Sequence, residues 1–493
     1  MNGAARGSFV LLVAMIIATS LNYAFTVGMG WLLGPEEYGI FGVSMAFLLL
    51  LGFLVQSGFP QTAAKFLSEE REDKLKILRT SLLGNLLIGF AVGAIFYLVM
   101  RIVNLGADYD SIMLVLALTV LIGSFAYVCY GALQGLFRFK NMGAFHVLDA
   151  VIKLLFGFSL VLLGFGALGA VLGMAIGTFF ALALALFWLR DTRFWRGRGL
   201  ASLDIYKFAA PMFFGTLPLV IFMNIDILGV RFLTASDELT GYYQATITLA
   251  RIPVWVILGV MGAAFPFISK YAEGELAKVY VRIPLKYSLL FLVPISIALM
   301  AAPEPLLYLF FPQEYLVASS ALVIVSLGMI FLVIINILAR SFQALGHPRI
   351  PALFLLPIAA IQILLLYLLV PRYGLIGAAS ATTIACFVGL IPLLWKSYRY
   401  KLGLSFNHRM IFSYGLLAVL LYFFPYYNGR IQTVLVMLAA GLAYLVSLVL
   451  FRLITREDMR IMLSGIFPRE NFITKRLLAR VGFMDSLAEK DDA

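Results

Sequence analysis

Long apolar stretches, separated by short polar segments, follow one another along almost the whole chain. There are fourteen such stretches of roughly twenty residues, enough for a helix to cross about 30 Å of hydrocarbon at 1.5 Å per residue. The pattern predicts an all-α polytopic membrane protein with fourteen transmembrane helices. The expected spans are residues 8–29, 38–58, 80–101, 111–135, 142–163, 167–189, 207–230, 240–265, 284–302, 316–340, 350–370, 374–396, 410–427 and 431–452.

The composition agrees with this pattern. The chain is 62% hydrophobic and 13% charged, and its mean hydropathy of +0.99 lies far above that of soluble globular proteins. No long polar insertion interrupts the stretches, which argues against a sizeable extramembrane catalytic domain. Cys129 and Cys386 both lie inside apolar stretches, so they indicate neither a metal site nor a disulfide framework. The first stretch is too long for the core of a signal peptide, and we interpret it as a membrane helix.

The basic residues predict how the helices are oriented. Of the 37 Lys and Arg residues, 31 fall on one side of the membrane, four fall on the other, and two lie within the spans. By the positive-inside rule, this bias places both termini in the cytoplasm. The net charge of +12 then indicates anionic lipid headgroups rather than nucleic acid. The basic tail at 456–493 either lies on such headgroups as a surface helix or only sets the topology.

The first twelve stretches form two sets of six that resemble each other. Four pairs of short motifs recur in the same order, about 200–210 residues apart. They are EEYGIF at 36–41 with ELTGYY at 238–243, FP at 59–60 with FP at 265–266, ALQG at 132–135 with FQALG at 342–346, and GALGA at 166–170 with GLIGA at 374–378. Because six is even, both copies share one orientation, which predicts a pseudo-two-fold axis along the membrane normal and a central cleft. The expected parts are an N-lobe at 1–200, a C-lobe at 201–405, helices thirteen and fourteen at 406–455, and the tail.

Polar residues form stripes on three of the predicted helices. The stripes are Gln244, Thr248 and Arg251 on helix eight, His146, Asp149 and Lys153 on helix five, and Thr19, Asn22 and Thr26 on helix one. Their spacing puts each set on one helix face. A charge at membrane depth costs at least ~2.5–3.5 kcal/mol on insertion scales, so Lys153 and Arg251 need a wet cavity or a partner. We expect the two cations to face one cavity from opposite walls.

Several motifs resemble one known family. They are LGPEEYG at 33–39, FAAP at 208–211, Asp226, SDE at 236–238, GYY at 241–243 and YGLIGA at 373–378. Over residues 8–455, the chain resembles the polysaccharide transporter, or Wzx-type oligosaccharide flippase, family of the MATE-like (MOP) superfamily. The resemblance implies a plasma- or inner-membrane transporter that turns an undecaprenyl- or dolichyl-linked oligosaccharide to the outer leaflet by alternating access. The implied partners are that lipid, membrane lipids and polysaccharide-assembly proteins, with a monomeric chain.

The resemblance suggests that the polar stripes bind the substrate. The candidate substrate-binding residues are Arg251, Lys153, Gln244, Thr248, Asn22, Thr26, Asp149 and Arg340. A lipid-linked sugar carries one or two phosphates, for which Arg offers a bidentate fork, while amides and hydroxyls suit sugar hydroxyls. A structural interpretation stays open for each charged residue: Asp149 would neutralise Lys153, Asp226 would pair with Arg251, and the side chain of Arg340 would extend to the membrane surface. The polar stripe on helix one would then only form hydrogen bonds to neighbouring helices.

Asp226 has a second candidate role. The resemblance to this family implies a candidate cation site, because some of its members hold a cation among helices seven, eleven and twelve. Here Asp226 would bind the cation, and Gln362, Thr382 and Thr383 could supply further oxygen ligands. The chain lacks a second acid on helix eleven, which weakens this hypothesis. We expect no cofactor and no bound metal, with Na⁺ or H⁺ as candidate coupling ions.

No motif indicates an enzyme. The three histidines are scattered without metal-ligand spacing, and no Gly-Lys-Ser/Thr loop is present to hold a nucleotide phosphate. A membrane glycosyltransferase or ligase would need a larger outer loop. A MATE-type multidrug/cation antiporter is the nearer alternative, but it would typically place acids in the cavity. The deep cations favour an anionic substrate instead. The sugar and the number of carrier phosphates stay open.

Overall fold

The computed structural model describes residues 2–68, 74–192, 204–257, 275–347, 349–400, 402, 408–423, 429–451 and 453. Within these residues all regular secondary structure is helical. The chain divides into two compact units, residues 1–404 and 405–493. The predicted tail at 456–493 and the motif Phe265-Pro266 lie outside the described residues.

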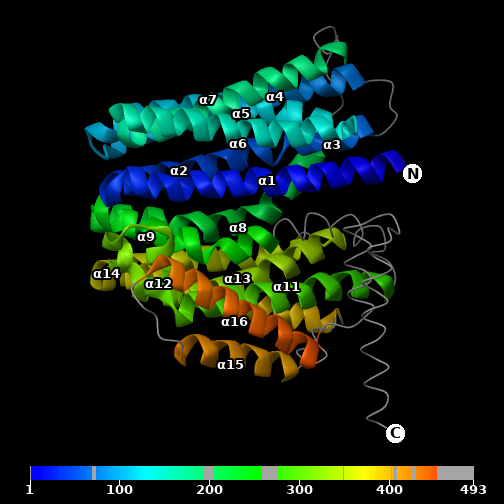
Figure 1. The fold of residues 1–493 in the computed structure, drawn as a ribbon. Helices are drawn as coiled ribbons and strands as arrows, with labels where there is room; N and C mark the ends of the chain where they lie inside the picture. Colours follow the sequence, from blue (N-terminus) through cyan, green and yellow to red (C-terminus); the bar gives the residue numbers. More distant parts are fainter. Residues whose placement is uncertain are drawn as a thin grey trace. The chain divides into compact units, whose positions relative to one another are not determined.

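The first seven helices form what we call the N-half. They are α1 Asn2–Leu32, α2 Gly34–Gln56, α3 Phe59–Ser68, α4 Lys74–Val103, α5 Ala107–Gly135, α6 Phe139–Leu160 and α7 Gly166–Leu189. Helix α5 packs against α2, α3, α4 and α7, while α6 packs against α1 and α7 (Figure 1). Apolar side chains of α3, α4, α5, α6 and α7 fill the space between them, with Cys129 fully buried among them.

The remaining helices of the first unit form the C-half. They are α8 Asp204–Thr234, α9 Asp237–Ala250, α11 Glu275–Ala301, α12 Pro303–Phe310, α13 Ser319–Ala344 and α14 Arg349–Arg399. Helix α14 packs against both α8 and α13, and α13 also contacts α9 and α11. The two halves meet mainly at α2, which packs against α8 and α9.

Two glycines break long helices at equivalent places. Helix α7 begins at Gly166 (φ 52°, ψ −142°) after a short π-helical turn at Val161–Phe165, and α14 is interrupted at Gly374 (φ 54°, ψ −126°). These are the first residues of the repeated GALGA and GLIGA motifs. Positive φ favours glycine, so the chain can turn back sharply at each point. In α14, Gln362 and Thr382 share a 3.2 Å hydrogen bond, although 20 residues of straight helix would separate them by about 30 Å.

A second repeated motif ends α5 and α13 in the same way. The N–H of Phe137 donates to Gln134 and that of Arg138 donates to Leu133, at 3.0 and 2.9 Å. In α13 the corresponding bonds run from Gly346 to Gln343 and from His347 to Phe342, at 3.1 and 2.8 Å. Matching letters in the sequence therefore correspond to matching backbone geometry at these ends.

The second unit contains α15, His408–Phe423, and α16, Arg430–Leu450. The two helices pack against each other, and the rings of Tyr414 and Tyr444 stack with centroids 6.5 Å apart.

Each predicted span overlaps helix in the described residues, often with ends that extend several residues further. The span predicted at 240–265 is interrupted at Arg251, and its last part lies outside the described residues. Two short helices, α3 and α12, were not predicted. Among the described residues, nine helical segments are long and apolar enough to cross a membrane, or ten if α11 and α12, bent by 98°, are counted as one span. Two of the nine, Phe139–Thr192 and Arg349–Arg399, contain the glycine breaks.

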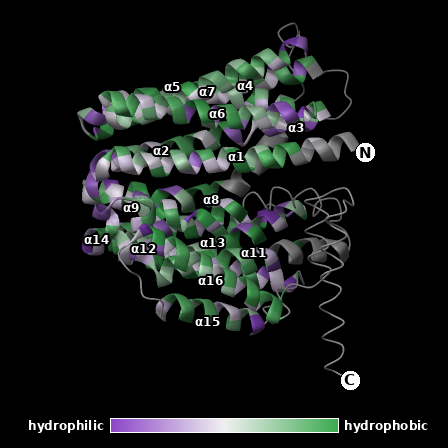
Figure 2. Ribbon diagram, viewed as in Figure 1, coloured by the Kyte–Doolittle hydropathy of each residue, from purple (hydrophilic) through white to green (hydrophobic). Residues whose placement is uncertain are grey.

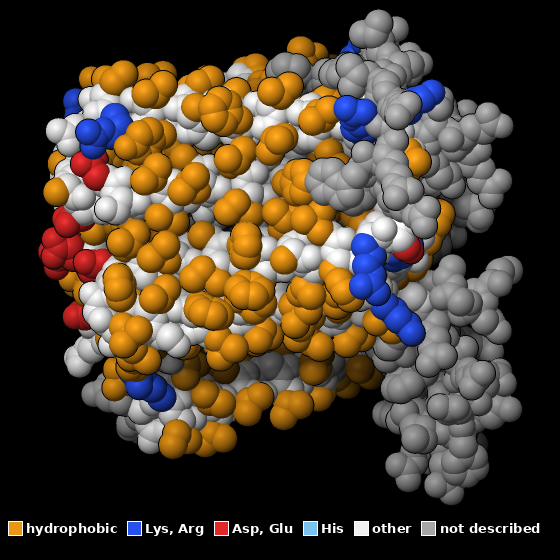
Figure 3. Space-filling view, turned by 90° about the horizontal axis from the view of Figure 1, so that it is seen from above, with side chains coloured by type: hydrophobic (Ala, Val, Ile, Leu, Met, Phe, Trp, Pro, Cys, Tyr) orange, Lys and Arg blue, Asp and Glu red, His pale blue; other side chains and the backbone are white. Residues whose placement is uncertain are grey.

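The surface fits a bilayer rather than water. Hydropathy colouring shows apolar residues along the helix bodies and polar ones near their ends (Figure 2). Figure 3 shows one face covered with hydrophobic side chains, with the charged groups gathered at its two ends: most of the acidic groups lie at the left end, beside some basic ones, and basic groups predominate at the right end. Large apolar side chains such as Leu87, Ile102 and Leu163 are at least 70% exposed. Such a surface would aggregate in water but suits lipid tails, so the protein is a multi-pass membrane protein.

Candidate functional site

Polar side chains with hydrogen-bond or ion-pair partners lie along the hairpin of α8 and α9. Ala235 turns the chain between the helices with a φ of 52°. Ser236 then caps α9, because its hydroxyl accepts a 3.2 Å hydrogen bond from the N–H of Leu239. Asp237 and Glu238 occupy the first turn of α9, where the helix dipole favours acidic side chains.

Arg251 stands at a break in the helix and pairs with Asp226 of α8. Helix α9 ends at Ala250, and Pro253 lacks the N–H that would continue the hydrogen-bond ladder. The Nη2 of Arg251 donates to both carboxylate oxygens of Asp226, at 2.8 and 3.0 Å. The pair is enclosed, since Arg251 is 7% exposed and Asp226 is 0% exposed. This geometry is the ion pair that the structural interpretation of Arg251 describes.

A chain of polar contacts extends from this pair to α14. The hydroxyl of Tyr243 donates to Asp226 at 3.1 Å, and Thr382 also interacts with that hydroxyl. The Nε2 of Gln362 donates to Thr382 at 3.2 Å, while the Oε1 of Gln362 is buried without a hydrogen-bond partner. Helices α8, α9 and both segments of α14 therefore contribute to one buried network inside the C-half.

The structure brings together only part of the predicted cation set. Asp226, Gln362 and Thr382 belong to the same network, but Thr383 faces α13 and donates to the carbonyl of Ile324 at 2.8 Å. Within the described residues, no group of three His, Cys, Asp or Glu side chains is arranged to hold a metal ion.

Gln244 and Thr248 contact the N-half. The Nε2 of Gln244 donates to the Oγ1 of Thr248 at 3.2 Å, and Thr248 shares a 3.4 Å hydrogen bond with the hydroxyl of Tyr38 on α2. All three side chains are buried, and Tyr38 is fully enclosed. This part of the predicted stripe lies at the junction of the halves.

Lys153 and Asp149 lie in a separate cluster within the N-half. The Nζ of Lys153 lies over the ring of Phe25 on α1, 5.7 Å from its centroid. The described part of the chain shows no ion pair between Lys153 and Asp149, and both residues are half-buried. His146 packs against the ring of Tyr130, with centroids 4.8 Å apart. Lys153 and Arg251 therefore belong to different polar clusters.

Of the other predicted site residues, Asn22 and Thr26 lie on α1 close in sequence to Phe25, and Arg340 lies on α13. Thr26 donates to the carbonyl of Asn22 at 3.0 Å, and the Oδ1 of Asn22 is buried without a partner. Arg340 is half-buried on α13, and its Nε has no hydrogen-bond partner in the described residues. Four residues earlier, the Oδ1 of Asn336 is also buried and unpaired.

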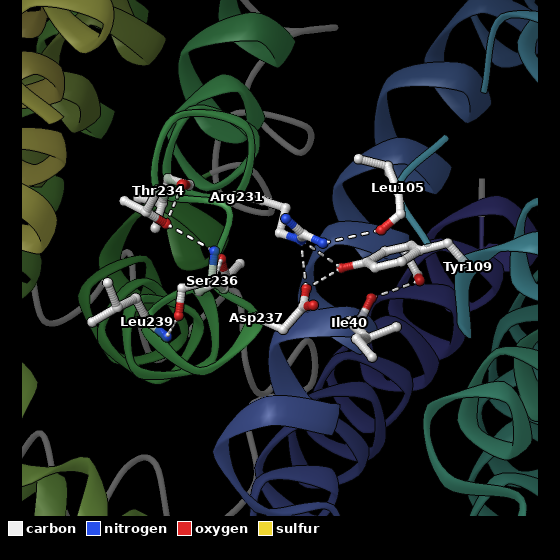
Figure 4. A network of polar contacts seen from close by, with 11 residues as sticks. Ile40, Leu105, Tyr109, Arg231, Thr234, Ser236, Asp237 and Leu239 are labelled. Carbon is white, nitrogen blue, oxygen red and sulfur yellow. Dashed lines mark hydrogen bonds and ion pairs between the residues drawn. The ribbon is translucent and has the colours of Figure 1, made fainter. Parts of the chain in front are cut away.

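A second ion pair of the α8–α9 hairpin reaches into the N-half (Figure 4). The Nε of Arg231 lies 2.6 Å from the Oδ1 of Asp237. Arg231 also donates to the hydroxyl of Tyr109 and to the carbonyl of Leu105, both at 3.2 Å, and Tyr109 donates to Asp237. We call Arg231, Asp237, Tyr109 and Leu105 the interhalf network.

Close to this network, α2 and α9 cross with their backbones in contact. A Cβ added at Gly39 would lie 1.9 Å from the carbonyl oxygen of Asp237, and one added at Gly241 would lie 1.8 Å from that of Pro35. Real Cβ contacts are never that short, so only glycine fits at either position. Gly39 and Gly241 occupy the same position in the repeated motif, so each copy of the motif packs against the other.

Aromatic residues continue the junction toward α1. The hydroxyl of Tyr315 donates to the carbonyl of Gly30 at 3.1 Å, and the Nε1 of Trp31 donates to that of Phe310 at 2.8 Å. The rings of Tyr38 and Tyr315 meet edge to face, with centroids 5.8 Å apart. All these contacts lie at the helix ends that the charge bias predicts to be outside.

Sequence reasoning did not find the interhalf network. Arg231 entered only as one of the basic residues on the outer side, Asp237 only within a family motif, and Tyr109 was not singled out. The repeated motif with Gly39 and Gly241 could have indicated this contact. Two copies of a motif that lie beside a pseudo-two-fold axis can pack against each other, and glycine allows their backbones to approach closely.

Comparisons with known proteins agree with this architecture. A family model described as polysaccharide biosynthesis protein matches residues 4–272. A probable low-salt glycan biosynthesis flippase, Agl15 of Haloferax volcanii, is 23% identical over 397 residues, covering 78% of this chain and 82% of the relative.

Solved structures share the fold. The lipid II flippase MurJ in an inward closed conformation superposes with a TM-score of 0.72 at 18% identity, covering 90% of this chain and 99% of that one. An inward-facing multidrug resistance MATE transporter of the MOP superfamily gives a TM-score of 0.62 at 16% identity, covering 79% and 99%. The fold is therefore that of MurJ and the MATE transporters.

Proposed function

Because the chain belongs to the polysaccharide biosynthesis protein family, we propose that it is a flippase for a lipid-linked glycan. The protein would move a polyprenyl-(pyro)phosphate-linked oligosaccharide from the cytoplasmic to the outer leaflet of the cell membrane. This movement would supply the synthesis of a surface polysaccharide or glycan. The relative from Haloferax volcanii, named as a glycan biosynthesis flippase and matched over most of both chains, supports this assignment.

The proposed architecture has fourteen transmembrane helices with both termini in the cytoplasm. Two six-helix bundles face each other, and α15 and α16 supply the last two spans. The equivalent breaks at Gly166 and Gly374 and the equivalent ends of α5 and α13 support the pseudo-symmetry. The bias of basic residues supports the orientation.

The proposed mechanism is alternating access, in which the halves separate at one end of the membrane and then at the other. The interhalf network, the crossing at Gly39 and Gly241 and the bond from Tyr315 to Gly30 join the halves at the predicted outer end. These contacts support a conformation closed to the outside. They must break before a glycan could leave on that side.

Lys153 is the proposed ligand of the lipid phosphate. The observation that carries this role is the position of its ammonium, which lies over the ring of Phe25 and forms no ion pair within the described residues, although the charge of Asp149 acts on it from nearby. An aromatic face stabilises a cation while leaving its hydrogen-bond donors available to an anion. Arg251 is already held by Asp226, whereas the unpaired Nε of Arg340 supports a secondary role for that side chain.

Depletion of the protein in its own cell tests the function. We expect the lipid-linked glycan to accumulate with its sugar accessible only from the cytoplasmic leaflet, as measured by a membrane-impermeant glycosidase or lectin on oriented vesicles. Lys153→Ala should reproduce the accumulation while the protein still reaches the membrane, and Lys153→Arg should restore part of the transport because it keeps the charge.

The alternatives give different results in the same cells. A ligase or glycosyltransferase would leave the lipid-linked glycan exposed on the outer leaflet or would prevent its formation. A MATE-type antiporter, which shares the fold, would leave the glycan unchanged and alter the efflux of cationic drugs. Either outcome would contradict the flippase assignment.

A further inference from the structure

The buried network around Asp226, which we call the Asp226 cluster, contains Arg251, Tyr243, Thr382 and Gln362. It lies where a cation site is expected, but its oxygen ligands are already occupied. The resembling family includes members with a cation held among the equivalent helices, and Asp226 is the acidic residue that would anchor such an ion here. Whether the cluster can hold a cation depends on three properties: how many of its oxygens are free of hydrogen bonds, which charges surround them, and how many of them point to one position.

The carboxylate of Asp226 has no free oxygen. Its Oδ1 accepts from Arg251 at 2.8 Å and from the N–H of Ile227 at 2.9 Å. Its Oδ2 accepts from Arg251 at 3.0 Å and from Tyr243 at 3.1 Å. An ionised carboxylate offers about four lone-pair sites, so these four hydrogen bonds saturate it.

The cation in contact with both oxygens is a single nitrogen. Nη2 of Arg251 lies at 2.8 and 3.0 Å from the two carboxylate oxygens, while Nε of the same guanidinium is buried without a partner. The contact is therefore not a fork in which two nitrogens bind two oxygens. One nitrogen bridges the carboxylate, as one monovalent ion would.

The rest of the cluster cannot support a second cation. Gln362 and Thr382 are neutral, and Thr383 points to α13. Hard cations bind several oxygen ligands, but Oε1 of Gln362 is the one side-chain oxygen of the described cluster that is buried without any hydrogen bond. A Na⁺ ion beside Arg251 would add a second positive charge around one buried carboxylate, where like charges repel strongly.

We propose that Arg251 is a built-in substitute for the coupling cation: its Nη2 occupies the cation position at Asp226, so this chain does not bind Na⁺ there. Arg251 lies at a one-residue interruption of the helix: its N–H still donates to the carbonyl of Ile247 and its carbonyl accepts from Trp255, while Pro253 has no N–H to donate. The inference concerns the ion that the chain binds and does not depend on which lipid it moves.

The test compares Na⁺ binding with and without the guanidinium. The full chain is purified in detergent, and its melting temperature is followed as choline chloride is replaced by NaCl at constant ionic strength. The wild-type protein should show no Na⁺-specific shift. Arg251→Gln should show a saturable rise of a few degrees, because it frees the carboxylate for a ligand that binds only the folded state. The double variant Asp226→Asn with Arg251→Gln should lose that rise.

Arg101→Gln is the matched control. It removes the arginine of another Arg–Asp pair, Arg101 with Asp110 at 3.0 Å, whose side chains are 55% and 50% exposed. An exposed carboxylate should not select Na⁺ over choline, so this variant should melt at the same temperature in both salts.

Two results would overturn the proposal. One is saturable ²²Na⁺ binding to the wild-type protein that the double variant abolishes, since Na⁺ would then share the site with Arg251. The other is a folded Arg251→Gln protein whose melting temperature ignores Na⁺. If Arg251→Gln does not accumulate in folded form, the ²²Na⁺ measurement on the wild-type protein and the charge-neutral double variant still decides.

Discussion

The α8–α9 hairpin carries two Arg–Asp pairs whose surroundings differ. The inner pair, Asp226 with Arg251, is enclosed by the C-half, with side chains 0% and 8% exposed. The outer pair, Arg231 with Asp237, has side chains 10% and 18% exposed and binds Tyr109 and Leu105 of the N-half. A pair inside one half can stay intact while the halves move. A pair bound across the halves must lose partners in that movement, so the inner pair suits a fixed role and the outer pair a switching one.

The largest expected effect comes from breaking the inner pair. Asp226→Asn leaves the charge of Arg251 buried and unpaired, and removing one partner of a buried pair typically costs about 3–5 kcal/mol. We expect a large fall in the melting temperature of the detergent-solubilised protein. Adding Arg251→Gln to the same chain should restore much of it, because the second change removes the stranded charge. A single variant that melts like the wild type would show that the pair is not structural.

The next effect tests the crossing of the halves. Gly241→Ala would place a Cβ 1.8 Å from the carbonyl oxygen of Pro35, so α2 and α9 must separate. Overpacking of this kind costs about 1–3 kcal/mol, and we expect faster hydrogen exchange at the outer ends of both helices.

Gly52 provides the control for this prediction. It also lies in α2, but a Cβ added there meets nothing within 4 Å. Gly52→Ala should therefore be neutral or slightly stabilising, as alanine in a helix interior usually is. Equal exchange rates in the two variants would mean that the crossing does not hold the halves together.

A smaller effect is expected in the interhalf network. Tyr109→Phe removes a hydroxyl that donates to Asp237 and accepts from Arg231, which should cost about 1 kcal/mol. Hydrogen exchange should increase on both sides of the network, in the segments 105–110 and 234–240. Tyr242→Phe removes a similar bond, to Glu238 within the C-half, and should leave segment 105–110 unchanged.

The sequence predicted the positions of the helices because their signal is local. An apolar stretch needs no partner to be recognised, and the repeated glycine motifs lie at the predicted helix starts. The structure adds that Gly166 and Gly374 have positive φ, a conformation that glycine adopts without strain. The same reasoning missed α3 and α12, which are too short to show as spans.

The candidate site was harder to predict because its chemistry depends on neighbours far apart in the chain. The stripe spacing correctly placed Gln244 and Thr248 on one face, but nothing in it indicates that this face meets Tyr38. Arg251 and Lys153 look alike in the sequence, as basic residues within apolar stretches that each have a candidate acidic partner. Only the fold shows that Asp226 binds one and that Phe25 lies under the other.

The smallest expected effect concerns a pair next to the interhalf network in the sequence. Arg101 and Asp110 form an ion pair of 3.0 Å, but their side chains are 55% and 50% exposed and both belong to the N-half. Water and salt screen such pairs, which typically contribute about 0–1 kcal/mol. Asp110→Asn should therefore change the melting temperature little, and any change should vanish in high salt, whereas Tyr109→Phe beside it should keep its effect there. If Asp110→Asn instead increased exchange in segment 234–240, the outer closure would depend on surface charge rather than on the buried contacts with Arg231 and Asp237.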